Sequence, residues 1–224
     1  MFLAFGKWKQ NRSTRDDPHT QDLGGSAIVT GNFYQKNDSA THYAFGSPKA
    51  DKLYGKVYIC YDCFGSNRDE SKDIALSGKE VICGNDIDCQ KHHGSRFGQA
   101  LAAVDLNGDD VDELIVGVPF YSADEKSDIG KVVIYHNPKY TRAVIFPGQQ
   151  SSSPSTELKF FQPKIPNLEK GSRFGSAISN VGDLQNDGFQ DFVVGAPYAG
   201  SEDGKGVVFV YRGSKNLNDL LKGI

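Results

Sequence analysis

A phrase that recurs about every 75 residues is the feature that most restricts how this chain can fold. Its closing apolar segments begin at Gly55, Gly130 and Gly206, so the 224 residues hold three units. The two later copies share SRFG (95–98 and 172–175), an acidic loop, LIVGVP or FVVGAP (114–119 and 192–197) and GKVVIY or GVVFVY (130–135 and 206–211). The earlier copy is weaker: LGGSAIVTGNF (23–33), YAFGSP (43–48) and GKVYIC (55–60). Self-similarity at this period indicates repeat architecture.

Each unit reads as short β-strands. The apolar segments are brief, rich in β-branched residues and bounded by Gly, Pro, Asn or Asp. Only the terminal NLNDLLKGI (216–224) is an ambiguous helix candidate. About four strands per unit suit a propeller blade, and a propeller closes with roughly four to eight blades. We therefore expect an all-β, partial β-propeller of three blades and a chain that is a fragment of a larger protein.

The repeat also predicts the domain boundaries. We expect a lead-in over 1–20, a degenerate blade with a cysteine-containing insertion over 21–93, and blades with acidic loops over 94–170 and 171–224. The chain is 38% hydrophobic with a net charge of −3, which excludes a disordered chain and gives no basic footprint for nucleic acid. No apolar run approaches the roughly 18 residues of a membrane span. The opening MFLAFGKWKQ is too short for a signal peptide.

Two acidic loops carry the candidate chemistry. DLNGDDVDE (105–113) and DLQNDGFQD (183–191) both place acids at positions one, five and nine. Carboxylates held this close repel one another by roughly 1 kcal/mol per pair in water and more where solvent is restricted, so a cation would relieve them. Oxygen donors favour Ca²⁺ over zinc or copper. The candidate ligands are Asp105, Asn107, Asp109, the Val111 carbonyl and Glu113 in one loop, and Asp183, Gln185, Asp187, the Phe189 carbonyl and Asp191 in the other.

Two alternatives compete with a calcium loop. An EF-hand needs a bidentate Glu at position twelve and flanking helices, but that position is Val116 or Val194, inside an apolar strand. Acidic turns can also be merely solvated, although the recurrence of one spacing in one repeat context disfavours that interpretation. The loops are therefore expected to be β-hairpin calcium loops. Gly188 suits the sharp turn at position six, and Gln185 at position three suggests a weaker site or one that binds through water.

The earlier unit provides an internal control. Counted from its Gly24, its first, fifth and ninth loop positions are Asn32, Lys36 and Ala40. A lysine among the ligands would oppose a divalent cation, so we expect no ion there. The sequence thus predicts two structural calcium sites.

These phrases resemble the FG-GAP repeats of integrin α subunits. The resemblance covers roughly residues 21–215, and the order of one degenerate unit followed by two acidic ones resembles blades three to five of a seven-bladed head. Departures are Val118 in the GAP phrase, Asp110 in place of the loop glycine, and Gln185. The last two put the affinity of individual ion sites in doubt.

The resemblance implies a function for the intact protein. It would be a membrane-anchored, extracellular adhesion receptor that pairs with an integrin β subunit through the upper face of the propeller. It would bind extracellular-matrix or cell-surface ligands, and the calcium loops would brace the opposite face. Membrane attachment would come only through parts absent from this chain. No ligand-contacting residue can be named from the sequence.

Modification sites fit an extracellular setting. Cys60, Cys63, Cys83 and Cys89 suggest two disulfides with three possible connectivities, while a zinc site or free thiols stay open as alternatives. Asn11 and Asn37 lie in glycan acceptor patterns.

An enzyme fragment is the competing class. Similar repeats follow the catalytic domain of glycosylphosphatidylinositol-specific phospholipase D, so this chain could be the C-terminal propeller of such a secreted protein. It contains no nucleophile elbow, phosphate-binding glycine loop or catalytic His/carboxylate set. We therefore expect no enzyme activity in this chain. A truncated product that never assembles is a third possibility.

Overall fold

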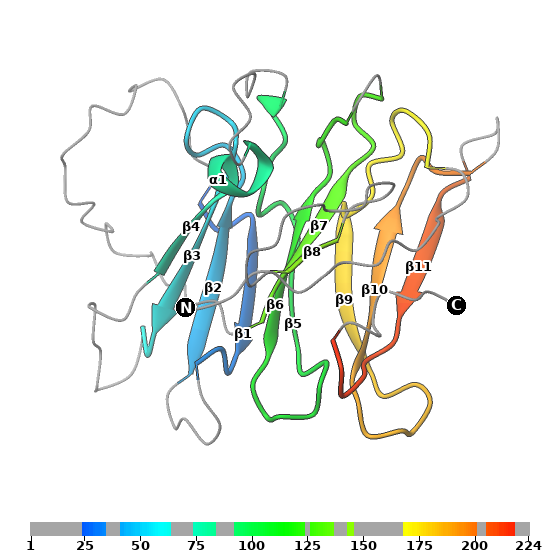
Figure 1. Cartoon of the computed structure of the whole chain (residues 1–224). Coiled ribbons are helices and arrows are strands. Elements are labelled where there is room, and N and C mark those ends of the chain that lie inside the picture. The colour runs from blue at the N-terminus through cyan, green and yellow to red at the C-terminus, as the bar shows by residue number, and fades with distance from the viewer. Residues whose placement is uncertain are drawn as a thin grey trace, which may run out of the picture.

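The computed structural model describes residues 24–34, 41–63, 74–83, 92–123, 126–136, 143–145, 168–200 and 205–217. Its strands form three separate antiparallel sheets, one per repeat, arranged side by side (Figure 1). The first unit contains β1 (Ala27–Gly31), β2 (His42–Ser47), β3 (Lys56–Tyr61) and β4 (Ile74–Ser77). The second contains β5 (Leu101–Val104), β6 (Glu113–Val118), β7 (Lys131–Tyr135) and β8 (Ala143–Ile145). The third contains β9 (Ala177–Gly182), β10 (Asp191–Ala196) and β11 (Val207–Tyr211). The predicted partial propeller of mostly β units is confirmed.

One short helix was not predicted. The helix α1 (Gly78–Cys83) follows β4 at the upper edge of the first sheet (Figure 1). Gly78 begins it by donating its N–H to the Gly55 carbonyl at 2.9 Å. A side chain at Gly78 would collide with the carbonyls of Tyr54 and Gly55. Only glycine fits at this close approach, which explains why the helix begins there. Six residues are too few for a helical period to be recognised in the sequence.

The three units share one register, which allows residues to be compared position by position. Gly31 pairs with His42, Val104 with Glu113, and Gly182 with Asp191. His42, Glu113 and Asp191 therefore occupy the same place, at the start of the second strand of each unit. Four residues further along lie the equivalent glycines Gly46, Gly117 and Gly195.

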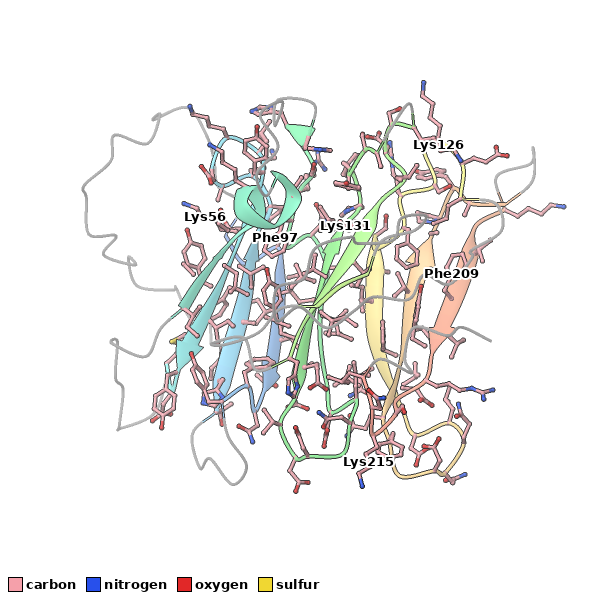
Figure 2. All side chains as sticks on the ribbon, viewed as in Figure 1. Lys56, Phe97, Lys126, Lys131, Phe209 and Lys215 are labelled. Carbon is pink, nitrogen blue, oxygen red and sulfur yellow. A yellow bond between two sulfur atoms is a disulfide. The ribbon has the colours of Figure 1, made fainter. Side chains whose placement is uncertain are left out.

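Apolar side chains fill the two spaces between adjacent sheets. One cluster joins the first and second units and includes Phe33, Phe97 and Val116. The other joins the second and third units and includes Leu106, Phe174 and Phe192. Phe97 is labelled between the sheets in Figure 2, and Phe209 of β11 packs against the second cluster. Burial of these faces is the main force that holds neighbouring units together.

Glycines set how closely neighbouring units approach. A Cβ at Gly46 would fall on the carbonyl oxygen of Gly98 in the second unit, and one at Gly117 on the carbonyl oxygen of Gly175 in the third. Only glycine permits this backbone contact. At Gly195, by contrast, the nearest heavy atom to an added Cβ is the Ala177 Cβ at 3.5 Å, an ordinary contact.

The third unit also exposes the residues that its neighbours bury. Leu184 is 54% exposed, whereas the equivalent Leu106 and Phe33 are fully buried. Val208 is 65% exposed, whereas its counterpart Val132 in the second unit is fully buried. The outer face of the third sheet thus has the composition of a unit interface but lacks the contacts of one within the described residues.

Candidate cation-binding loops

The two acidic loops lie at the same edge of neighbouring sheets. One connects β5 to β6 and the other connects β9 to β10, and both descend to the lower edge in Figure 1. The α1 helix and the turns that contain the Phe-Gly pairs lie at the opposite edge. The loops are hairpin connections as expected, and the predicted ligands of both loops lie at this edge.

The first-position carboxylates organise both loops. Asp105 Oδ1 accepts from the N–H groups of Gly108 (2.8 Å) and Asp109 (3.2 Å), and its Oδ2 accepts from Asp110 N–H (2.9 Å). Asp183 accepts in the same manner from the N–H groups of Gln185, Asp187 and Gly188, at 3.2, 3.1 and 2.8 Å. These donors, Gly188 foremost, hold the pKa of Asp183 below its ordinary value. Each loop is thus shaped around its first-position carboxyl group.

Left-handed residues at positions four and six let the loops curl. The first loop has Gly108 at φ 72° and Asp110 at φ 65°, and the second has Asn186 at φ 57° and Gly188 at φ 92°. Each loop therefore has one glycine at these two positions, at position four in the first loop and at position six in the second. Asp110 keeps the turn that the loop glycine would make, at the cost of strain in an L-residue.

The third and fifth positions support the same turn. Asn107 Oδ1 accepts from Asp109 N–H at 2.9 Å, and Asp109 Oδ1 accepts from Val111 N–H at 2.8 Å. In the second loop Asp187 Oδ1 accepts from Phe189 N–H at 3.1 Å. Carboxylate and amide oxygens have a second lone pair after one such bond, so these atoms retain capacity for a cation.

The ninth-position carboxylates lie beneath the loops. Glu113 is fully buried, and its Oε2 accepts a hydrogen bond from Leu106 N–H at 2.8 Å. Its Oε1 forms a second hydrogen bond with His136 Nδ1, at 2.6 Å. Burial raises the pKa of Glu113 despite the opposing effect of His136, and the hydrogen bond to Glu113 raises the pKa of His136.

Asp191 is 1% exposed and takes the equivalent place in the third unit. It accepts from Leu184 N–H at 2.9 Å and Gly213 N–H at 2.8 Å. The Gln185 side chain also donates to it, at 3.4 Å. The third-position residue of this loop therefore acts as a donor in the structure rather than presenting its oxygen.

The donor atoms fit a hard cation in type, because the loops offer carboxylate, amide and backbone oxygens. Within the described residues, however, no three His, Cys, Asp or Glu side chains converge as a group ready to hold a metal. Asp109 and Asp187 at position five are exposed, whereas Glu113 and Asp191 at position nine are buried. The two calcium sites, with their Val111 and Phe189 carbonyls, remain a prediction.

The ninth position of the first unit was assigned incorrectly from the sequence. The strand register places His42 there, not Ala40, because this loop is two residues longer than the other two. Lys36 and Ala40 lie outside the described residues. His42 is fully buried, and its Nδ1 accepts from Phe33 N–H at 3.0 Å. Counting back four residues from the glycine of YAFGSP, rather than forward from Gly24, would have found it.

The loops also link adjacent units. Asp112 N–H donates to the Asn32 carbonyl at 2.7 Å, and Asn32 N–H returns a bond to Asp112 Oδ2 at 2.7 Å. Gln190 N–H donates to the Asp105 carbonyl at 3.3 Å in the equivalent place. Burial raises the pKa of Asp112, and the bond from Asn32 opposes this shift. The eighth loop residue of one unit therefore holds the first loop residue of the unit before it.

The modification sites are partly visible. Cys60 and Cys63 form a disulfide. The Cys83 side chain, Cys89 and both glycan candidates, Asn11 and Asn37, lie outside the described side chains, so their roles remain predictions. In the part of the chain that the structure describes, no helix is both long and apolar enough to cross a membrane.

Comparison with known proteins identifies the repeat. The FG-GAP repeat family matches residues 97–135 and 174–211. The chain is 31% identical to integrin alpha-PS3 of Drosophila melanogaster over 192 residues, 86% of this chain and 14% of that protein. It is 29% identical to integrin alpha-5 of Xenopus laevis over 219 residues, 94% of this chain and 17% of that protein.

A third relative, integrin alpha ina-1 of Caenorhabditis elegans, is 38% identical over 137 residues, 58% of this chain and 11% of that protein. The chain thus spans less than a fifth of the length of these relatives. All three are integrin alpha subunits rather than enzymes, in agreement with the prediction that the chain is not catalytic. The chain carries FG-GAP repeats and is a relative of part of the integrin alpha subunits.

Proposed function

We propose that this chain is part of the propeller of an integrin α-type adhesion receptor that pairs with a β subunit and binds extracellular-matrix or cell-surface ligands. The observation that carries the proposal is the match of two successive units to FG-GAP repeats within a segment similar to integrin alpha subunits. The outer face of the third sheet supports a larger propeller, since Gly195, Leu184 and Val208 repeat the interface residues of the inner units.

An extracellular location at the cell surface is part of this proposal. The Cys60–Cys63 disulfide supports it, because such bonds persist in oxidising compartments. The phospholipase alternative gains no support from the relatives named above, all of which are integrin alpha subunits.

Calcium would brace the two acidic loops. When bound, the ion would supply positive charge between the carboxylates at positions one and five, while the chain's own N–H groups already fix their orientation. The proposed role is structural: the loops hold the lower edge of neighbouring units together through Asp112 and Gln190.

Calorimetric titration of the full chain with CaCl₂ tests this role. We expect two bound ions, one in Asp187→Ala, and two in the control Glu169→Gln, which removes an exposed acid at the opposite edge. A ligand of the folded state alone stabilises it by about 2.7 kcal/mol at a hundredfold excess over its Kd. A folded chain that binds no calcium would refute the metal assignment while leaving the receptor assignment standing.

Pairing with a β subunit is proposed for the edge opposite the loops. There Arg96 and Arg173 lie over the ring of Phe120 at 4.5 and 4.8 Å, and Arg173 also lies 4.8 Å from the ring of Tyr198. Tyr198 is 57% exposed, so an aromatic surface remains available. In a co-expression assay with an integrin β subunit, we expect Tyr198→Ala to reduce recovery of the complex. Lys215→Ala, which changes an exposed residue at the loop edge (Figure 2), is the control. Equal loss in both variants would contradict the assignment of the face.

A further inference from the structure

One hydrogen bond recurs at the base of all three loops, including the loop expected to bind no ion. The ninth-position side chain accepts the backbone N–H of the second-position residue in every unit. The bonds are Phe33 N–H to His42 Nδ1 at 3.0 Å, Leu106 N–H to Glu113 Oε2 at 2.8 Å, and Leu184 N–H to Asp191 Oδ2 at 2.9 Å. The acceptor is an imidazole in one unit, a glutamate in the next and an aspartate in the third.

The ninth-position side chains are also among the most buried polar groups of the chain. His42 and Glu113 are fully buried, and Asp191 is 1% exposed. A buried side chain of this kind is costly unless it is hydrogen-bonded, and so is a backbone N–H that has left water. The bond therefore satisfies two groups at once, one at each end of the loop.

Each ninth-position residue also contacts the last residue of the third strand or a residue just after it. The His42 ring lies 5.1 Å from the Tyr61 ring, Glu113 bonds His136, and Asp191 accepts from Gly213 N–H. The ninth residue thus joins three segments: the entry to the loop, its exit, and the end of the strand paired with that exit.

We propose that the ninth-position residue is a latch that closes the loop of each unit by accepting the second-position N–H, and that the latch works without a bound cation. The first unit carries this inference, because its latch is the imidazole nitrogen of His42. A neutral imidazole accepts through Nδ1 when Nε2 carries the proton, so negative charge is not required. The proposal is independent of calcium binding and assigns the ninth residue a positioning role in all three units.

Two substitutions at one site separate the latch from simple core filling. Asn places its Oδ1 the same number of bonds from Cα as the imidazole Nδ1, so His42→Asn keeps the acceptor, whereas His42→Leu fills space without one. Amide hydrogen exchange, measured by NMR on the full chain in EDTA, reports Phe33 N–H directly. The amides of the β2–β3 ladder serve as the internal reference for an intact first unit.

We expect Phe33 N–H to exchange at least about tenfold faster in His42→Leu, the scale of one lost hydrogen bond, and to stay near the wild-type rate in His42→Asn. The reference amides should remain protected in both. Unchanged protection of Phe33 in the Leu variant, or equal loss in both variants, would overturn the proposal.

A second pair covers the case in which His42→Leu does not fold. Asp191→Leu and Asp191→Asn test the same bond at Leu184 N–H, in a loop whose second residue is exposed. Faster exchange in the Leu variant alone supports the latch, and equal exchange in the two refutes it. Because EDTA is present throughout, neither result depends on whether the loops bind calcium.

Discussion

Asp110 takes the sixth position of the first acidic loop, where the loop of the third unit has a glycine. It sits at φ 65°, in the place where the second loop has Gly188. An L-residue in this conformation costs roughly 1–2 kcal/mol. Glycine removes this strain, but its greater conformational freedom in the unfolded chain offsets part of the gain in stability. Asp110→Gly should therefore stabilise the protein by about 0.5–1 kcal/mol in urea unfolding with chelator present.

The matched control is Asn186, two residues before Gly188 in the loop of the third unit. Asn186 is also left-handed, at φ 57°, but asparagine tolerates this conformation better than most residues. Asn186→Gly should change the free energy of unfolding by less than Asp110→Gly. A net destabilisation by Asp110→Gly would show that its side chain contributes more than the strain it causes.

The Glu113–His136 pair makes stability depend on pH. His136 has a pKa raised from its ordinary 6.5, so its contribution is complete below that value and is lost as pH rises through the folded pKa. The pKa of buried Glu113 is raised from 4.5, and its contribution also declines as pH rises. The pKa of Asp183 is lowered from 3.8, so its contribution is present above that value and is lost as pH falls through the folded pKa.

Stability should therefore be greatest in mildly acidic solution and decline towards pH 8. Urea unfolding midpoints between pH 5 and 8.5 measure this decline. His136→Gln should reduce the slope, because the titrating partner of Glu113 is gone, while Lys215→Gln on the same edge should leave it unchanged. A slope that is identical in wild type and His136→Gln would exclude the pair as its source.

At the scale of elements, the glycines of the second strands determine how closely two sheets pack. Gly117→Ala places a Cβ on the carbonyl oxygen of Gly175, a backbone atom that cannot move without shifting the third sheet. We expect a loss of about 1–3 kcal/mol, the usual cost of overpacking. Gly195→Ala meets only an ordinary contact at 3.5 Å and should be nearly neutral.

Urea unfolding of the two variants provides the comparison. Gly117 pairs with Val132 and Gly195 with the equivalent Val208, so a difference between the two variants reports the neighbouring unit. Equal destabilisation would mean that the strand itself, rather than the interface, requires glycine.

The sequence predicted these elements because the period of the repeat fixes where strands start and end. It located both acidic loops for the same reason. It misplaced the ninth residue of the first unit because a two-residue insertion between Asn32 and His42 leaves no local signal. It also missed the partnership of Glu113 with His136, since contacts between residues on different strands depend on register rather than on spacing along the chain.

At the scale of the whole molecule, the outer face of the third sheet is apolar and open. Val208 is 65% and Val210 40% exposed on β11. A contiguous apolar sheet face in water favours association. Light scattering of the wild-type chain should therefore show an apparent mass that rises with concentration.

Substitution at equivalent positions distinguishes a surface effect from a fold effect. Val208→Asp should leave the chain folded and reduce its association, because the charge is added where water already reaches. Val132→Asp, at the equivalent and fully buried position, should unfold the chain, since an unpaired carboxylate cannot be accommodated between two sheets. Val208→Thr, which adds polarity without charge, should have an intermediate effect on association. If Val208→Asp unfolded the chain as Val132→Asp does, the third sheet would not be an open face in solution, and the contacts covering it would have to be sought elsewhere in the chain.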